Sequence, residues 1–152
     1  MKLTTLQNIQ LFAFIILLAI YHYYIHNGLE KTFSKAYFEY DAVKRPLSKC
    51  QGREKSLRLE CIGMPSGHAE TASVFSFLLY FYKIIPLWMC LLIIFIISMH
   101  RVITNMHTIS QVAVGATLGY IYAFIYKNYS LALGFIIVFS IGLLLSILSA
   151  YK

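Results

Sequence analysis

Acidic residues are scarce in this chain and are confined to one stretch of it. The 152 residues include six Asp and Glu, all of which fall between positions 30 and 70, so residues 71–152 contain none. A two-metal site built inside helices, or an aspartate-rich Mg²⁺–diphosphate motif, needs carboxylates in those helices. The distribution of acids therefore excludes both kinds of site from the second half of the chain.

Charged residues of either sign are also few. They make up 12% of the chain, whereas hydrophobic residues make up 59%; ordinary soluble domains are about 25% charged and about 45–50% apolar. This composition is typical of an integral membrane protein, and it excludes a disordered chain, a collagen and a disulfide-rich miniprotein. The net charge of +7 is explained by the loops of a membrane protein, so no nucleic-acid partner is expected.

Long segments without Lys, Arg, Asp or Glu predict an all-α fold, an integral membrane helical bundle of about five transmembrane helices in a single domain, residues 1–152. A span needs about 20 apolar residues, or about 17 where the bilayer is thinned. The predicted spans are 5–26, 68–84, 86–101, 107–126 and 130–150, with a long polar active-site loop at 27–67. The first span has no small-residue cleavage site after it, so we expect a retained anchor. The pair Gly115 and Gly119 predicts close helix packing.

With an odd number of spans, the loop 27–67 and the junction 101–107 share one face of the membrane, opposite the amino terminus. A single polar mouth in an apolar bundle predicts a site. The polar residues that collect on this face are Lys44, Arg45, Ser66, His68, His100, Arg101, His107 and Gln111.

The segment Gly63-Met-Pro-Ser-Gly-His68 combines turn residues with the start of a span. Ser66 is a suitable N-cap, and the free amides of a helix start, with the positive end of the helix dipole, favour a phosphate oxygen. His68 would then lie in the first turn, placed to donate a proton to a leaving oxygen. The same residues are equally consistent with an ordinary helix start.

A second group of polar residues lies downstream. Five residues separate Arg101 from His107, and Gln111 follows His107 by four, which is one helical turn on the same face. Arg and His are costly to bury in a membrane and usually have a function there, although both could simply be interfacial residues at span ends. Two histidines, an arginine and a helix amino terminus on one face match what phosphoryl transfer through a phosphohistidine requires.

The order Arg45-Pro46, Pro65-Ser66-Gly67-His68 and Arg101-x5-His107 resembles the three signature motifs of the type-2 phosphatidic acid phosphatase superfamily, which are membrane lipid phosphatases. The resemblance covers roughly residues 35–125. It implies that His107 is the nucleophile and His68 the general acid, and that no metal or cofactor takes part. The phosphate-binding residues that it implies are Arg45, Arg101, Ser66 and Gly67, with Lys44 or Lys35 as a substitute for the lysine of the first motif.

Three positions depart from the family pattern. Phe38 stands where the first motif has lysine, His100 stands where the third has serine, and Gln111 replaces the aspartate that orients the nucleophile. A Gln carbonyl can accept the same hydrogen bond from the histidine ring but brings no charge.

The run His107-Thr-Ile-Ser-Gln111-Val is similar to the dolichyl diphosphatase branch, where Gln is normal at that position. The resemblance therefore implies hydrolysis of a polyprenyl or dolichyl diphosphate, a membrane lipid, to the monophosphate. Three alternatives stay open: a phosphatidate-type monophosphate phosphatase, a catalytically silent lipid-binding relative, and a haem-binding bundle. The last would use the five histidines, with His22 and His26 one helical turn apart and joined at the same face by His68, His100 and His107. The oligomeric state is not predicted.

The sequence contains two conflicting indications of orientation. Of the 13 basic residues, all but Lys2, Lys83 and Lys127 lie on the face of the polar loop, which by the positive-inside rule is cytosolic. The family resemblance implies a lumenal or external active site, which we favour. Cys50 and Cys61 would close a ring of 12 residues in this loop. They either form a disulfide, which would persist outside the cytosol, or remain two loop thiols.

Overall fold

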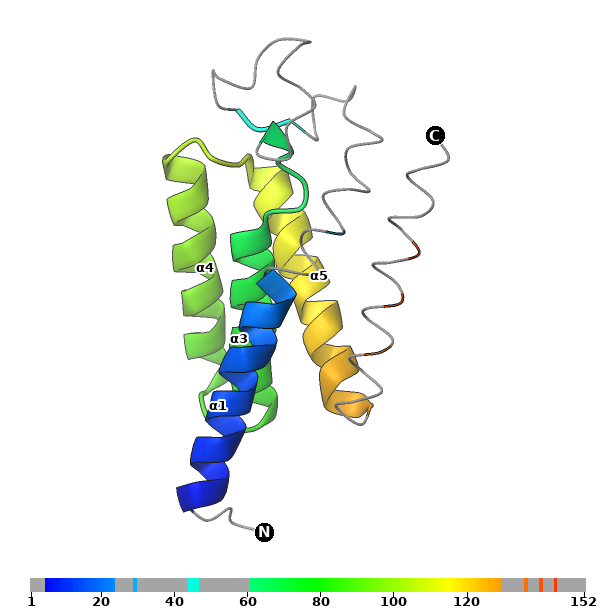
Figure 1. Cartoon of the computed structure of the whole chain (residues 1–152). Helices are drawn as coiled ribbons and strands as arrows, with labels where there is room; N and C mark the ends of the chain where they lie inside the picture. Colours follow the sequence, from blue (N-terminus) through cyan, green and yellow to red (C-terminus); the bar gives the residue numbers. More distant parts are fainter. Residues whose placement is uncertain are drawn as a thin grey trace.

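The structure, a computed structural model, describes residues 5–23, 29, 44–46, 61–129, 136, 140 and 144. Most of these residues lie in helices. Four helices are defined there: α1 (Thr5–Tyr21), α3 (Gly67–Phe81), α4 (Leu87–Ile103) and α5 (Ile109–Asn128). They run in alternating directions (Figure 1). Extended pairing within the described ranges is limited to one antiparallel bridge, between Lys44 and Ile62. The predicted all-helical class is confirmed for this part of the chain.

The helix bounds lie close to four of the predicted spans. α1 and α3 correspond to 5–26 and 68–84, and α4 and α5 correspond to 86–101 and 107–126. Most of the predicted fifth span, 130–150, and most of the loop 27–67 lie outside the described residues. The count of five spans therefore stays a prediction.

Tight turns separate the last three helices. Lys83, between α3 and α4, and Asn105, between α4 and α5, both have positive φ angles, of 60° and 54°. Such left-handed residues reverse the chain within a few positions. Pro86 is the N-cap of α4, where its missing N–H and fixed φ do not disturb the ladder of helix hydrogen bonds. The turns make α4 antiparallel to both α3 and α5.

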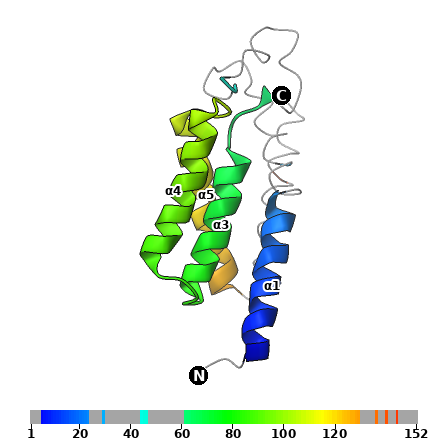
Figure 2. The same cartoon turned by 90° about the vertical axis from the view of Figure 1, so that its left-hand side faces the viewer.

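α3 is the central helix, and it packs against α1, α4 and α5. Figure 2 shows α1 and α4 on different sides of it. The core lies between α1, α3 and α5, and it is made of apolar side chains and two tyrosines. Its buried members are Ile15, Leu18, Val74, Leu78, Leu79, Tyr122, Ala123 and Tyr126.

Two glycines allow α3 and α5 to approach closely. A Cβ atom on Gly115 would lie 2.6 Å from the carbonyl oxygen of Ser66, and one on Gly119 would lie 2.3 Å from the carbonyl oxygen of Glu70. Both obstacles are backbone atoms, which cannot move aside as a flexible side chain can. The close packing predicted for this pair is confirmed, and it sets the position of the first turn of α3 against α5.

By length and hydropathy, the described ranges contain one helix able to cross a membrane, α5, together with the shorter apolar helices Leu11–Tyr21 and Leu87–Ile103. The side chains of α4 are largely exposed and apolar: Cys90 is its one buried residue, while Trp88 is 65% and Phe95 is 61% exposed. An apolar surface of this extent is characteristic of a face that meets lipid or another protein.

Candidate active site

One end of the bundle gathers the starts of α3 and α5, the end of α4, and the segments 44–46 and 61–66 (Figure 1). A backbone hydrogen bond joins the two helix starts, because the N–H of Ser66 donates to the carbonyl of Gln111 at 3.2 Å. Segment 44–46 is attached to segment 61–63 by the N–H of Arg45, which donates to the carbonyl of Cys61 at 3.0 Å. Residues from all three sequence motifs therefore meet at this end.

The turn between α4 and α5 fixes the backbone of His107. The carbonyl of Arg101 accepts hydrogen bonds from the N–H groups of Met106 and His107, at 3.0 and 3.1 Å. The spacing of five residues between Arg101 and His107 is thus the length of one closed turn. It brings the end of α4 directly to the start of α5.

His107 does not lie on α5, contrary to the expectation that it shares a helix face with Gln111. Thr108 is the N-cap of α5, and it forms a capping box in which its hydroxyl oxygen accepts from the Gln111 N–H at 3.3 Å. The helix can therefore begin only after Thr108. His107 precedes the cap, yet the capping box still brings its ring and the Gln111 side chain together.

The ring of His107 is buried, at 2% exposed, and its Nδ1 faces two oxygen atoms. The carbonyl oxygen of Gly63 lies at 2.9 Å and Oε1 of Gln111 at 3.3 Å. Both are acceptors, so Nδ1 carries the proton and donates it. In the neutral ring this tautomer leaves the lone pair on Nε2, and that atom is then available as a nucleophile.

The amide of Gln111 links three segments. Its Oε1 accepts from the N–H of Thr108 at 3.2 Å as well as facing His107, and its Nε2 donates to the carbonyl of Lys44 at 2.7 Å. The donation to a carbonyl fixes which amide atom is nitrogen and which is oxygen. Gly63 leaves the space for this amide, because a Cβ there would lie 2.4 Å from Oε1. Gln111 therefore orients His107 and also holds segment 44–46.

Two polar groups that belong to the sequence motifs have no hydrogen-bond partner within the described residues. One is the hydroxyl of Ser66 and the other is Nε of Arg101, and both atoms are buried. Ser66 is the N-cap by position, but the expected side-chain cap is absent. Buried polar groups are normally satisfied, so each of these two is suited to binding a polar ligand.

Lys44 and Arg45 lie in the bridge with segment 61–63. Nε of Arg45 donates to the carbonyl of Ile62 at 3.2 Å, which holds the guanidinium next to the segment that leads into α3. Cys61, in the same segment, is disulfide-bonded, whereas Cys90 is free. Cys50, the partner that the sequence analysis considered for it, lies outside the described residues.

His68 lies in the first turn of α3, as expected, and it is exposed. Its ring meets that of Tyr23 edge to face, with the centroids 5.2 Å apart. His107, in turn, is connected with Gln111, Gly63 and the turn at Arg101. Both histidines lie at the same end of the bundle, where the hydrogen bond between Ser66 and Gln111 joins the starts of α3 and α5.

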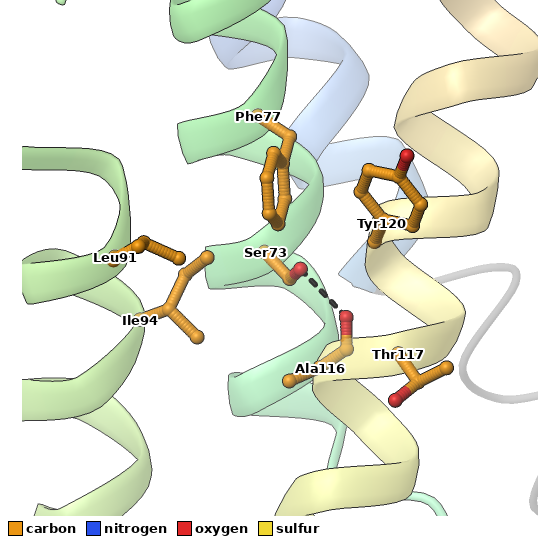
Figure 3. Close-up of a pocket in the computed structure, with 7 residues that line it drawn as sticks. All are labelled: Ser73, Phe77, Leu91, Ile94, Ala116, Thr117 and Tyr120. Carbon is orange, nitrogen blue, oxygen red and sulfur yellow. Dashed lines mark hydrogen bonds between the residues drawn. The ribbon is translucent and has the colours of Figure 1, made fainter. Parts of the chain in front are cut away.

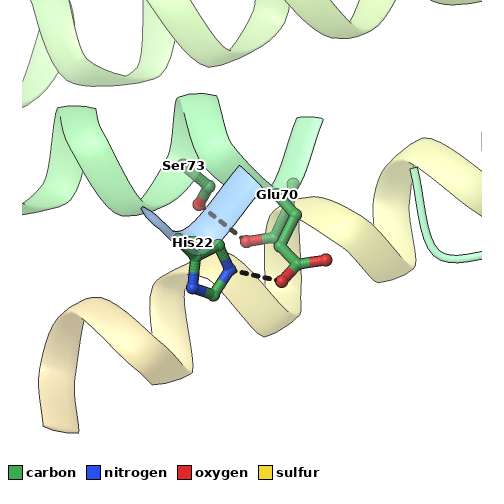
Figure 4. Close-up of polar contacts among 4 residues, drawn as sticks. His22, Glu70 and Ser73 are labelled. Atoms are coloured by element: carbon green, nitrogen blue, oxygen red, sulfur yellow. Dashed lines mark hydrogen bonds and ion pairs between the residues drawn. The ribbon is translucent and has the colours of Figure 1, made fainter. Parts of the chain in front are cut away.

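A buried pair that the sequence analysis did not identify lies beneath the first turn of α3. Nε2 of His22, at the end of α1, donates to Oε1 of Glu70 (Figure 4), and both side chains are fully buried. The signal that could have found it is the carboxylate of Glu70 inside a predicted span. His22 was a candidate haem ligand; this hydrogen bond occupies its Nε2, and His26 lies outside the described residues.

An apolar groove runs between α3, α4 and α5, about two helical turns from the helix starts. Its volume is about 300 Å³. The one hydroxyl on its α3 wall, that of Ser73, donates to the carbonyl of Ala116 at 2.7 Å (Figure 3), so this polar group is satisfied within the protein. The groove is lined by Ser73, Phe77, Leu91, Ile94, Ala116, Thr117 and Tyr120.

Comparison with known protein families gives a match over most of the chain. The PAP2 superfamily, the type-2 phosphatidic acid phosphatases, matches residues 10–135, a range that contains all the site residues described above. No curated protein and no solved structure matches the chain. Members of this superfamily are phosphatases, which are hydrolases of phosphate esters. With the match extending over most of its length, the chain belongs to the PAP2 superfamily.

Proposed function

We propose that this protein hydrolyses a polyprenyl or dolichyl diphosphate to the monophosphate and inorganic phosphate, through a phosphohistidine at His107. The observation that carries the proposal is the pair of acceptors at Nδ1, Gly63 and Gln111. They hold the proton on Nδ1 and leave the lone pair of Nε2 for attack on phosphorus. This chemistry uses no metal ion.

In the first step, Nε2 of His107 attacks the terminal phosphorus and forms a P–N bond. The P–O bond to the bridging oxygen breaks, and its electron pair leaves with the polyprenyl monophosphate. His68 donates a proton to that oxygen. In the second step, His68 takes a proton from water, the resulting hydroxide attacks the phosphohistidine, and the P–N bond breaks to release phosphate and restore His107.

Charge on the transferring phosphoryl group is proposed to be stabilised by the start of α3 and by cations. The amides of the first turn, at Gly67 and His68, point towards the helix start, where the helix dipole is positive. The buried hydroxyl of Ser66 and Nε of Arg101, with no hydrogen-bond partner within the described residues, would bind phosphate oxygens. Arg45 and Lys44 would add positive charge from the adjoining bridge.

The carbonyl of Gly63 explains how a neutral Gln111 can serve in place of a carboxylate. The ring of His107 has a second and closer acceptor, so its tautomer and orientation do not depend on Gln111 alone. Because Gln111 carries no negative charge, it stabilises the cationic ring of His107 less than a carboxylate would. A substrate with a good leaving group, such as a phosphate monoester anion, requires less of that stabilisation than a simple alcohol does. This supports a diphosphate substrate.

The apolar surfaces support a lipid substrate. The groove lined by Ser73 and Leu91 begins about 10 Å from Ser66 along α3, given a rise of about 1.5 Å for each residue. A hydrocarbon chain attached to a phosphate at the helix starts would reach it. The exposed apolar side chains of α4 would meet the surrounding bilayer, as a multi-pass membrane protein requires.

The disulfide of Cys61 supports an active site on the lumenal or external side of the membrane. Disulfides persist in oxidising compartments and are rare in the cytosol. Cys61 is directly joined to the site, because its carbonyl accepts from the N–H of Arg45. This favours the orientation implied by the family over the one implied by the number of basic residues.

Phosphate release by the purified full-length protein tests the proposal. Dolichyl diphosphate, undecaprenyl diphosphate and phosphatidic acid are supplied in parallel, each with and without EDTA. We expect release from a polyprenyl diphosphate that is insensitive to EDTA and absent in His107→Ala. Preferential release from phosphatidic acid would favour the monophosphate phosphatase. Tight binding of these lipids without release would favour a catalytically silent relative.

A further inference from the structure

The end of α1 meets the first turn of α3 through two neighbouring residues. His22 hydrogen-bonds Glu70 in the interior, and Tyr23 contacts the ring of His68 at the surface. Glu70 and His68 are two positions apart on α3. Successive residues of α1 thus contact both sides of the turn that carries the proposed general acid.

The pair formed by His22 and Glu70 is enclosed by aromatic rings of α5. The ring of His22 lies 5.0 Å from that of Tyr122 and 6.4 Å from that of Tyr126, measured between centroids. A carboxylate buried in such surroundings is costly unless it is hydrogen-bonded. Each partner therefore keeps the other in place, and their hydrogen bond fixes the position of the end of α1 along α3.

Glu70 also belongs to the framework of the phosphate-binding turn. Its N–H donates to the carbonyl of Ser66 at 2.9 Å, and its own carbonyl lies against Gly119 of α5. A shift of Glu70 would move Ser66 and His68 with it. The pair is thus attached to the backbone of the site, not only to the hydrophobic core.

Tyr23 is placed by the local conformation of α1. The α-helix ends at Tyr21, and His22 and Tyr23 continue in a π-helical turn, a conformation found frequently at functional sites. In this turn His22 points into the core while Tyr23 reaches His68. Since His68 is exposed, an edge-to-face contact with a neighbouring ring limits the orientations that it can adopt.

We propose that the end of α1 is part of the active site, with Tyr23, His22 and Glu70 acting as positioning residues for His68. Tyr23 orients the ring of His68. The buried pair of His22 and Glu70 fixes the end of α1 against α3 and so keeps Tyr23 beside that ring. The proposal rests on the function proposed above, in which His68 donates a proton to the leaving oxygen. It predicts that these residues act through His68.

The test compares Tyr23→Ala with the conservative Tyr23→Phe, which keeps the ring, and with Tyr129→Ala, a control at the opposite end of α5. The first readout needs no activity: the NMR signal of the His68 ring in protein labelled with ¹³C-histidine, assigned by its loss in His68→Ala. The Tyr23 ring current should shift this signal. We expect a change in Tyr23→Ala and His22→Phe but not in Tyr129→Ala, and only a small change in Tyr23→Phe.

The second readout is a double-mutant cycle on turnover of dolichyl diphosphate. Tyr23→Ala should lower kcat by roughly 10- to 10²-fold with little change in KM, the cost of a misplaced catalytic group. Tyr23→Phe should retain most of the activity, and so should Glu70→Gln, whose amide oxygen can still accept from His22. In a His68→Ala background, Tyr23→Ala should have no further effect.

Two results would overturn the proposal: an unchanged His68 signal in Tyr23→Ala, or an equal loss of kcat from Tyr23→Ala whether or not His68 is present. If the wild-type protein releases no phosphate, the proposed function fails, while the NMR readout still decides whether Tyr23 positions His68. Should His22→Phe fail to fold, the Tyr23 variants decide the result by themselves.

Discussion

Nδ1 of His107 lies 2.9 Å from the carbonyl oxygen of Gly63, a residue 44 positions earlier in the chain. This bond joins the segment that leads into α3 to the segment that leads into α5. A backbone carbonyl cannot be removed by a side-chain substitution, and it holds the ring in one tautomer. The proposed nucleophile is therefore oriented partly by the backbone, and Gln111 supplies the second acceptor.

Because Nδ1 of His107 has two acceptors, we expect Gln111→Ala to lower kcat only moderately. Because Gly63 still accepts from His107, the loss should be that of about one hydrogen bond, about 0.5–1.5 kcal/mol, or up to roughly tenfold in kcat. Gln111→Glu should keep kcat near the wild-type value but lower the unfolding temperature, since it cannot donate to the carbonyl of Lys44. Steady-state kinetics and thermal unfolding in detergent measure the two effects. A wild-type rate in Gln111→Ala would contradict the assigned role.

We expect a Cβ on Gly63 to lower kcat by displacing the side chain of Gln111. It would lie 2.4 Å from Oε1, and this flexible amide can move aside, so Gly63→Ala should lower kcat about as much as Gln111→Ala does. In a Gln111→Ala background the obstacle is gone, and Gly63→Ala should be nearly neutral. Measuring kcat for the two single variants and the double variant decides this. Equal losses in both backgrounds would show that Gly63 matters for another reason.

The sequence predicted much of this arrangement, because helix ends and motif residues leave local signals. The apolar segments anticipated α1, α3, α4 and α5, and the pair Gly115 and Gly119 anticipated the close approach of α3 and α5. The meeting of His107 and Gln111 was also anticipated, although the capping box at Thr108 places His107 outside the helix. Each of these features is signalled by residues a few positions apart in the sequence.

The features that were missed depend on distant parts of the chain. The carbonyls of Gly63 and Lys44 are backbone groups, so no residue type marks them as acceptors. The bond between His22 and Glu70 joins positions 48 residues apart, and only the packing of α1 on α3 brings them together. A buried carboxylate needs a partner, but the sequence offers several histidines and does not select among them.

A substitution in the groove between α3, α4 and α5 should weaken the binding of a lipid substrate and leave the turnover of a substrate without a hydrocarbon tail unchanged. Leu91 lines it, whereas Leu92, about equally exposed on the same helix, does not. Leu91→Ala should raise KM for a polyprenyl diphosphate about fourfold for each methylene group removed from the groove wall, at about 0.8 kcal/mol each. Leu92→Ala is the matched control. Turnover of p-nitrophenyl phosphate, which has no hydrocarbon tail, should change in neither variant, and equal KM values for the two leucine variants would exclude this groove as the tail site.

Because Cys61 is disulfide-bonded, we expect reduction to lower the thermal stability of the protein. Closure of a ring of 12 residues with Cys50 is worth about 3 kcal/mol in the chain-entropy estimate, so dithiothreitol should lower the unfolding temperature of the wild type but not of Cys61→Ser. Sidedness is measured with an impermeant maleimide on sealed vesicles of known orientation. Both loop cysteines should be labelled from the lumenal or external side, and only after reduction. Labelling from the cytosolic side without a reductant would refute both the bridge and the orientation.

The phosphohistidine is tested by trapping it. The purified protein is mixed with a polyprenyl diphosphate labelled with ³²P in its terminal phosphate, in the presence of EDTA, and is quenched in alkali, which preserves a P–N bond. We predict label on the wild-type protein, located at His107 by mass spectrometry of its peptides, and none on His107→Ala. Label that persists in His107→Ala, or rapid turnover by the wild type with no labelled protein at any time, would contradict a covalent intermediate at His107.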